Sequence, residues 1–291
     1  MNNRRTVVAI PASYDSSENL ELESTKKYLS YLENNLADTV MTTAGTSHFN
    51  LLSNKEVHDL NKCVVENFKG KKIIGIPALS TNQAIEFVEE ANDYIDDNTN
   101  LMALYPERFY EERFIKNYMH SIREKTANKI YIHGKTIRNA TGGVWDYNSS
   151  ILNELFSEQV LEGIKEEHSN LYKSYDFVSK LNAELDVIVA GGSMRRFEFL
   201  ESAGANAFLS GVGNLFPHIE QQYLDGDRGA SLEIEKRFFD VFMKYGWHKS
   251  LRIGLDILNL TCYNDRSPWP QRDPEEYKEI EKIIEVIKNE K

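Results

Sequence analysis

A strand that ends on a lysine is found in the stretch Val160-Leu161-Glu162-Gly163-Ile164-Lys165-Glu166-Glu167-His168. The polar residues after Lys165 lead into a new helical pattern. Two interpretations of this lysine are open. A lysine that leaves the core can pack its stem and keep its head in water. If it is buried instead, its neutral amine is favoured, and a neutral amine is a nucleophile toward carbonyl carbon.

This strand is the sixth of eight apolar, β-branched runs that alternate with helical patterns. Strands that are apolar along their whole length and separated by helices are typical of a parallel sheet covered on both faces. Eight such units in about 220 residues predict an α/β fold, a closed (β/α)8 TIM barrel. An open doubly wound sheet normally carries a glycine-rich loop after its first strand, and Pro11-Ala12-Ser13-Tyr14-Asp15 contains no glycine. The expected strands are residues 6–11, 39–43, 72–77, 101–106, 129–134, 161–166, 186–192 and 207–213.

Helix starts and a C-terminal helical layer are also visible in the sequence. Ser53 and Glu56 have the spacing of a capping box and predict a helix over residues 53–68. After the eighth unit, three helical patterns cover residues 232–245, 249–258 and 274–291. No linker rich in Pro, Gly or Ser precedes them. We therefore predict a barrel over residues 1–225 with helices of residues 226–291 packed on it as one structural unit.

Composition excludes several classes of function. The 291 residues are 41% apolar, as in a globular protein, and their net charge of −11 argues against a nucleic-acid binder. No run approaches 18 apolar residues, so we expect no membrane span and a cytoplasmic location. Cys63 and Cys262 form neither a disulfide framework nor a zinc site, and no metal site is expected.

In a TIM barrel, chemistry lies at the carboxyl ends of the strands. Neighbouring strands are about 4.8 Å apart, so inward-facing residues at the ends of strands five and six would bring His133 beside Lys165. The alternation of side chains along a strand then turns Ile164 and Glu166 outward. Small residues after strands seven and eight leave room for a ligand. This set of residues fits Schiff-base chemistry, in which an amine attacks a ketone and a neighbouring acid/base moves protons.

Several segments together resemble the dihydrodipicolinate synthase / N-acetylneuraminate lyase family of class I aldolases. The segment that contains Lys165 is similar to the family's "VGIKEASGD" strand, and residues 189–193 through 204–210 are similar to its "SGDD…GGDGVIS" stretch. Thr42-Thr43-Ala44-Gly45-Thr46 stands where the family has GTTGE, and Asn50-Leu51-Leu52-Ser53-Asn54-Lys55-Glu56 resembles its "LS-x-EE" helix start. Arg266-Ser267-Pro268 is similar to its "RPP" loop. The resemblance covers nearly the whole chain.

The resemblance implies roles for individual residues. Lys165 would form an imine with pyruvate or a related 2-oxo acid, so that no separate cofactor is needed. Thr43 would line the carboxylate site and pass protons, whereas Ala44 would offer only its backbone N–H group. The other residues that would border the substrate are Gly45, Gly191 and Gly192.

Three positions depart from the family pattern or match it weakly. His133 falls where the catalytic tyrosine is expected; an imidazole of pKa about 6.5 carries protons differently from a phenol of pKa about 10. The alternative is a packed histidine bonded to backbone. Arg138 stands where the family often has an arginine that grips a substrate carboxylate. The expected loop of residues 135–146 is longer than the family's. Tyr110 is the candidate for the family tyrosine that reaches the site of a neighbouring subunit. The alternative is an ordinary packed aromatic residue. Further possible pocket residues are His48, Tyr105, Trp145 and Arg195.

Function follows as an expectation from this resemblance. The chain is expected to be a lyase that joins or cleaves a 2-oxo acid and an unidentified aldehyde through Lys165. The first alternative is dihydrodipicolinate synthase itself, which combines pyruvate and aspartate semialdehyde and is supported mainly by Arg138. A second alternative is a 2-oxo acid-binding or regulatory protein with little turnover. By resemblance, the partners would be other copies of the chain in a homotetramer or homodimer.

Overall fold

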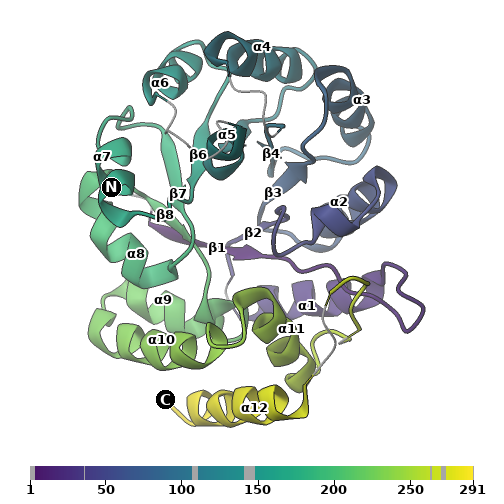
Figure 1. The fold of residues 1–291 in the computed structure, drawn as a ribbon, viewed down its shortest axis with the longest axis vertical. Helices are drawn as coiled ribbons and strands as arrows, with labels where there is room; N and C mark the ends of the chain where they lie inside the picture. The colour runs from purple at the N-terminus through teal and green to yellow at the C-terminus, as the bar shows by residue number, and fades with distance from the viewer. Residues whose placement is uncertain are drawn as a thin grey trace.

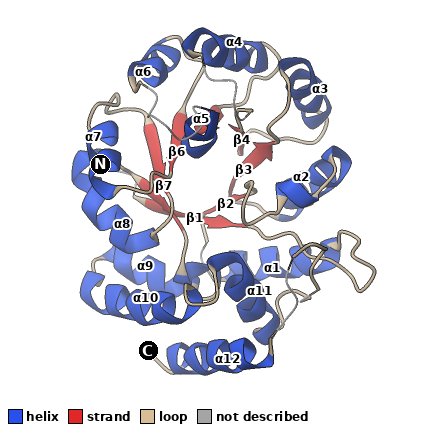
Figure 2. Cartoon of the chain, viewed as in Figure 1, coloured by secondary structure: helices blue, strands red, loops and turns tan. Residues whose placement is uncertain are grey.

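The fold was analysed in a computed structural model that describes residues 4–35, 37–106, 111–140, 148–262, 264–269 and 273–290. Figure 1 shows a ring of helices around a central barrel of strands, with the last helices gathered on one side. Figure 2 shows the same arrangement by element type. Within these described ranges, no helix is long and apolar enough to cross a membrane.

The centre of the fold is a closed barrel of eight parallel strands in the described part of the chain, ordered as in the sequence. The predicted α/β TIM barrel is thereby confirmed. The strands are β1 (Arg5–Ala9), β2 (Thr39–Met41), β3 (Lys71–Ile76), β4 (Thr99–Ala103), β5 (Ile130–His133), β6 (Gly163–Glu166), β7 (Asp186–Val189) and β8 (Ala207–Leu209).

Helices cover the outside of this barrel and bury its outward-facing apolar side chains, which is why the strands are apolar on both faces. The helices up to the eighth strand and just after it are α1 (Leu22–Asn34), α2 (Asn54–Asn67), α3 (Thr81–Ala91), α4 (Glu112–Arg123), α5 (Gly134–Ala140), α6 (Ser150–Ser157), α7 (Leu171–Val178), α8 (Ser193–Leu200) and α9 (Pro217–Asp225).

Three further helices form the C-terminal layer, as the sequence predicts. They are α10 (Arg228–Phe242), α11 (Trp247–Ile257) and α12 (Pro274–Lys288), and α12 packs on α10 and α11 on the side away from the barrel (Figure 1). Ile280, Ile284 and Ile287 are the buried face of α12. Spacings of three and four residues place these side chains on one stripe of the helix.

Two local expectations have different outcomes. The capping box is present, because the Ser53 hydroxyl accepts from the Glu56 N–H and the Glu56 carboxylate accepts from the Ser53 N–H. The expected loop over residues 135–146 is wrong in its first part, because α5 begins at Gly134 directly after β5. This helix has no Ser, Thr, Asp or Asn at its start to announce it.

Candidate active site

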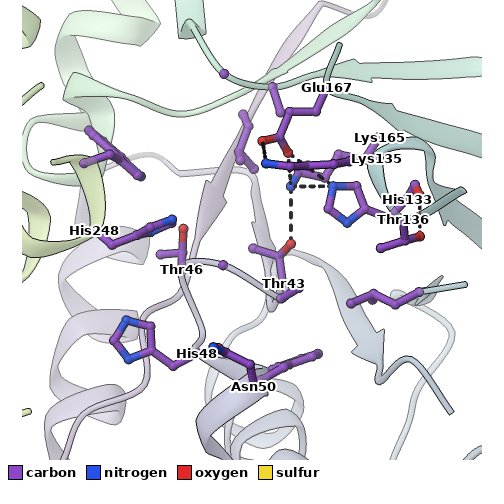
Figure 3. Close-up of a pocket in the computed structure, with 18 of the residues that line it drawn as sticks. Thr43, Thr46, His48, Asn50, His133, Lys135, Thr136, Lys165, Glu167 and His248 are labelled. Atoms are coloured by element: carbon purple, nitrogen blue, oxygen red, sulfur yellow. Dashed lines mark hydrogen bonds and ion pairs between the residues drawn. The ribbon is translucent and has the colours of Figure 1, made fainter. Parts of the chain in front are cut away.

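A cavity of about 1120 Å³ opens at the carboxyl ends of the strands. Figure 3 shows that side chains from several strand ends point into it. Of the predicted site residues, Thr43, Ala44, Gly45, His133, Lys165, Gly191 and Gly192 line its walls. Of the further possible pocket residues, His48, Tyr105 and Arg195 also line it.

Lys165 and the two residues predicted to act with it meet at one end of this cavity. His133 on β5 and Lys165 on β6 are register partners, and Lys165 Nζ lies 3.2 Å from His133 Nε2. Lys165 Nζ also donates to Thr43 Oγ1 over 3.3 Å (Figure 3). Glu166 points the other way, as alternation requires, and is fully buried. The β5–β6 register brings the amine and the imidazole together, and the segment after β2 brings the Thr43 hydroxyl within hydrogen-bonding distance of the amine.

Burial controls the charges of this group. It lowers the pKa of Lys165 below its ordinary value, although the carboxylate of Glu167 opposes that shift. Burial, together with the charge of Lys165, lowers the pKa of His133 to about 4. His133 is therefore a neutral imidazole near pH 7, able to accept a proton. The interpretation of Lys165 as a solvated strand-end lysine is wrong, since only 4% of its surface is exposed.

Glu167 is the site residue that sequence reasoning missed. Its Oε2 lies 3.2 Å from both Lys165 Nζ and His133 Nε2, and its Oε1 accepts from Lys135 Nζ over 2.9 Å. Burial alone would raise the pKa of Glu167, but Lys165, the His133 hydrogen bond and Lys135 together lower it well below its usual range. The only signal in the sequence was its position two residues after Lys165, which gives both side chains the same side of the strand.

The loop after β2 is held in a compact shape that presents Thr43. The Ser47 hydroxyl accepts from the Thr43 N–H over 2.9 Å and donates to the carbonyl of Ile10 over 2.5 Å. Within the described residues, the N–H groups of Ala44 and Gly45 donate no hydrogen bond. These two donors lie beside the Thr43 hydroxyl and are suited to a carboxylate.

His48 occupies an unusual place at the end of the same loop. It has a left-handed backbone, with φ 55° and ψ 37°, and only 1% of its surface is exposed. Burial lowers its pKa to about 3, and Arg252 and His248 contribute to this shift. Neither ring nitrogen has a hydrogen-bond partner among the described residues. A non-glycine residue in this conformation costs roughly 1–3 kcal/mol, and such strain is often found at functional sites.

The small residues after β7 shape the opposite wall. Gly191 has φ +79°, a conformation that side-chain-bearing residues rarely adopt. It is followed by Gly192 and by Ser193 at the start of α8. Arg195 on α8 lines the cavity and pairs with Glu235 of α10. The two glycines therefore line the cavity without adding a side chain to it.

Arg138 is not brought into the cavity. Its guanidinium donates to the buried carboxylate of Glu166 over 2.7 Å, on the outer side of β6, and lies over the ring of Phe177. Arg138 is not among the described residues that line the cavity. The predicted contact of Arg138 with a substrate carboxylate is therefore not supported by its position, because a protein carboxylate already engages it. Tyr110 and Trp145 lie outside the described residues.

The C-terminal helices supply the outer wall of the cavity, which sequence reasoning did not anticipate. Phe239 comes from α10, Met243 directly follows that helix, Trp247 and His248 come from α11, and Trp269 comes from the loop before α12. The Phe239 and Trp247 rings are 5.7 Å apart. This wall is aromatic and largely apolar. The basic side chains on the described walls have acidic partners: Lys135 and Lys165 pair with Glu167, and Arg195 pairs with Glu235.

The last loop also fastens the barrel loops next to the site. Arg266 donates to the carbonyl of Leu51 over 2.7 Å and pairs with Glu56 over 2.6 Å. Arg252 donates to the carbonyl of Ala12, just after β1. The segments after β1 and β2 are therefore held in place from the C-terminal part of the chain.

Comparisons with known proteins agree with this architecture. Residues 2–287 match the model of the dihydrodipicolinate synthetase family. No curated protein matches the sequence. Among solved structures, dihydrodipicolinate synthase from Agrobacterium tumefaciens has a TM-score of 0.81 at 16% identity, with 98% of both chains covered. N-acetylneuraminate lyase from Fusobacterium nucleatum has a TM-score of 0.83 at 13% identity, covering 98% of this chain and 99% of that one. The 4-hydroxy-tetrahydrodipicolinate synthase from Methylacidiphilum fumariolicum has a TM-score of 0.78 at 19% identity, covering 98% of this chain and 96% of that one. These structures share the fold with this chain.

Proposed function

The chain belongs to the dihydrodipicolinate synthetase family, and from this premise we propose that it is a class I aldolase that acts through Lys165. Members of this family and the N-acetylneuraminate lyases similar to it are carbon–carbon lyases. The proposed reaction joins a 2-oxo acid such as pyruvate to an aldehyde, or cleaves the corresponding product. Its covalent intermediate would be an imine on Lys165, so that no separate cofactor is required.

One observation carries this proposal. Lys165 is a buried amine of lowered pKa that faces an open cavity, with His133 and Thr43 within hydrogen-bonding distance. Its ion-pair partner Glu167 also lines the cavity, so the pair lies beside open space that a reactant can enter. Desolvation is a known means of making a lysine nucleophilic.

The geometry supports a sequence of steps. The N–H groups of Ala44 and Gly45 and the Thr43 hydroxyl would bind the carboxylate of the 2-oxo acid. This would hold its carbonyl carbon near Lys165 Nζ for attack. After loss of water, the iminium would withdraw electrons from the neighbouring carbon, and the neutral imidazole of His133 would accept or return protons during carbon–carbon bond formation or cleavage.

The outer wall supports an uncharged aldehyde with an apolar body as the second reactant. Phe239 and Trp247 offer ring surfaces, and the cations on the described walls are already paired with carboxylates. Dihydrodipicolinate synthase activity is less well supported, because the argument for it rested on Arg138, which Glu166 engages outside the cavity. A carboxylated aldehyde such as aspartate semialdehyde would meet no free guanidinium on these walls.

Reductive trapping tests the proposed function. The protein is incubated with pyruvate, reduced with borohydride and digested, and the mass shift is mapped by peptide. We expect a pyruvyl adduct on the peptide that contains Lys165, and none in Lys165→Ala. Absence of an adduct with pyruvate and with larger 2-oxo acids would refute the imine mechanism. Adduct formation without turnover on an aldehyde panel would instead support the binding-protein alternative.

A further inference from the structure

We propose that Glu167 is a further catalytic residue, which forms with His133 a carboxylate–imidazole pair that transfers protons at the nitrogen of Lys165. The inference rests on the proposed imine function and adds to it a proton carrier that the family pattern does not contain. In the family's "VGIKEASGD" strand, the residue two positions after the lysine is alanine, which has no titratable group.

The contacts form a closed triangle. Lys165 Nζ, His133 Nε2 and Glu167 Oε2 are separated from one another by 3.2 Å along each side (Figure 3). Each atom is thus within hydrogen-bonding distance of the other two. A proton on the lysine nitrogen has two acceptors at equal distance, and the two acceptors can pass a proton to each other.

Backbone geometry explains why the carboxylate reaches the lysine. Residues two apart on a strand point to the same side. Glu167 is the first residue after β6, and this alternation continues to it, because Lys165 and Glu167 both line the cavity. Glu166, between them, faces outward and is held by Arg138 and Ser174. Alternation thus places Glu166 in the core and Lys165 and Glu167 at the cavity.

The two carboxylate oxygens of Glu167 have different partners because of Lys135. Its ammonium, which is half exposed, contacts Oε1 of Glu167 over 2.9 Å and leaves Oε2 to Lys165 and His133. The pair Lys135–Glu167 holds the carboxylate in place at the mouth of the cavity. Of the side chain of Glu167, 25% is exposed, so a bound reactant can reach its free edge.

This arrangement permits a balanced imine-forming step. The low pKa of Glu167 depends on the charge of Lys165, so when the ammonium gives one proton to Glu167 both charges disappear together, which burial favours. The free amine then adds to the carbonyl carbon while the C=O π electrons move to oxygen. His133 takes a proton from the new ammonium nitrogen and gives it to that oxygen, which yields a neutral carbinolamine. Glu167 then returns its proton to the hydroxyl group, which leaves as water as the C=N bond forms. The net change is ketone and lysine ammonium to iminium and water, with both carriers restored.

The test measures the rate of borohydride-trapped imine with pyruvate as a function of pH. In Glu167→Gln we expect the maximal rate to fall by about 10²- to 10⁴-fold, the usual contribution of a general acid–base group. The acid limb of the profile should move to lower pH, because the carboxylate that raises the pKa of Lys165 has been removed. The shift of the acid limb reports the loss of the carboxylate charge beside Lys165, and the fall in the maximal rate reports the loss of a proton carrier. A residue that acted only through its charge would shift the limb and leave the maximal rate unaltered.

Two further variants complete the test. Glu162→Gln, which removes a surface ion pair with Lys129 at the start of the same segment, is the matched control and should change neither rate nor profile. The double variant His133→Tyr/Glu167→Ala introduces both family residues together. Its fold-decrease in the rate of imine trapping should be smaller than the product of the decreases in the two single variants, since the pair acts as a unit. Thermal melting first checks that Glu167→Gln and Glu167→Ala are folded. If both then trap imine at the rate and with the pH profile of the unaltered protein, the inference is wrong. No adduct in the unaltered protein would refute the proposed function instead.

Discussion

His133 and Lys165 are direct register partners across the β5–β6 pair, and their side-chain nitrogens are 3.2 Å apart. The position of the imidazole is therefore fixed by the hydrogen-bond ladder of the sheet and does not depend on a loop. Sheet register is a global property of the barrel, so it fixes the two neighbouring backbone positions from which Lys165 and His133 meet.

Replacement of the imidazole should separate imine formation from turnover. His133→Phe keeps a ring of similar size at a buried position but removes both nitrogens. We expect kcat for aldol cleavage or condensation to fall by about 10²- to 10⁴-fold, while some trapped adduct on Lys165 remains. Steady-state kinetics and mass mapping on the same preparation check this. Unchanged kcat would remove His133 from the mechanism.

Arg138→Leu should affect stability more than substrate binding. Removal of one partner from a buried ion pair leaves an uncompensated charge on Glu166, which costs about 3 kcal/mol when other donors remain. Ser174 and the His168 N–H are such donors. Urea unfolding measures the loss, and KM for the 2-oxo acid should stay close to that of the unaltered protein. A large rise in KM with little change in stability would return Arg138 to the substrate site.

Trp247→Leu should alter the preference for the aldehyde. The indole forms part of the aromatic wall beside Phe239, so its loss should raise KM for an aldehyde with an apolar ring, such as benzaldehyde, by about tenfold. KM for pyruvate, whose proposed site is at the other end of the cavity, should not change. Equal effects on a carboxylated aldehyde and an aromatic one would contradict the proposed apolar partner.

Acid should destabilise the protein through its buried histidines. The pKa of His48 is lowered to about 3 in the folded chain, whereas an unfolded histidine titrates near 6.5. The unfolded state therefore binds the proton first, and folded stability falls as pH decreases from about 6.5 toward 3. Each such histidine contributes a slope of about 1.4 kcal/mol per pH unit within the window. Urea unfolding of His48→Gln between pH 7 and 4 should give a flatter profile, and parallel profiles would show that His48 is not the group responsible.

Much of the barrel could be predicted from short-range pattern, because a fully covered parallel strand must be apolar on both faces. The strand ends were less accurate. The expected run 186–192 exceeds β7, which ends at Val189, because the residues after it leave the hydrogen-bond ladder to build the cavity wall. Strand propensity does not distinguish a residue in the ladder from one just beyond it.

Lys165 and His133 could be placed together because strand order and alternation determine which side chains meet, and Thr43 was added to them by the family resemblance. The aromatic wall could not, since Trp247 and Trp269 reach the cavity only through packing of the C-terminal helices, and no local pattern encodes that contact. Glu167 was missed for a different reason: a polar residue after a strand was interpreted as the approach to a helix. If the alternation of side chains had been extended by two residues beyond Lys165, it would have predicted that Glu167 faces the cavity.

The attachment of the loops after β1 and β2 to Arg252 and Arg266 bears on how such proteins diverge. A chimera that joined the barrel of this chain to the C-terminal helices of a relative would keep every strand. It would exchange Arg252 and Arg266, which hold the segments after β1 and β2, for the relative's residues at those positions. The outer wall of the cavity would be exchanged in the same event. Specificity and the support of the catalytic loop are thus inherited together, and recombination near residue 226 would replace both at once.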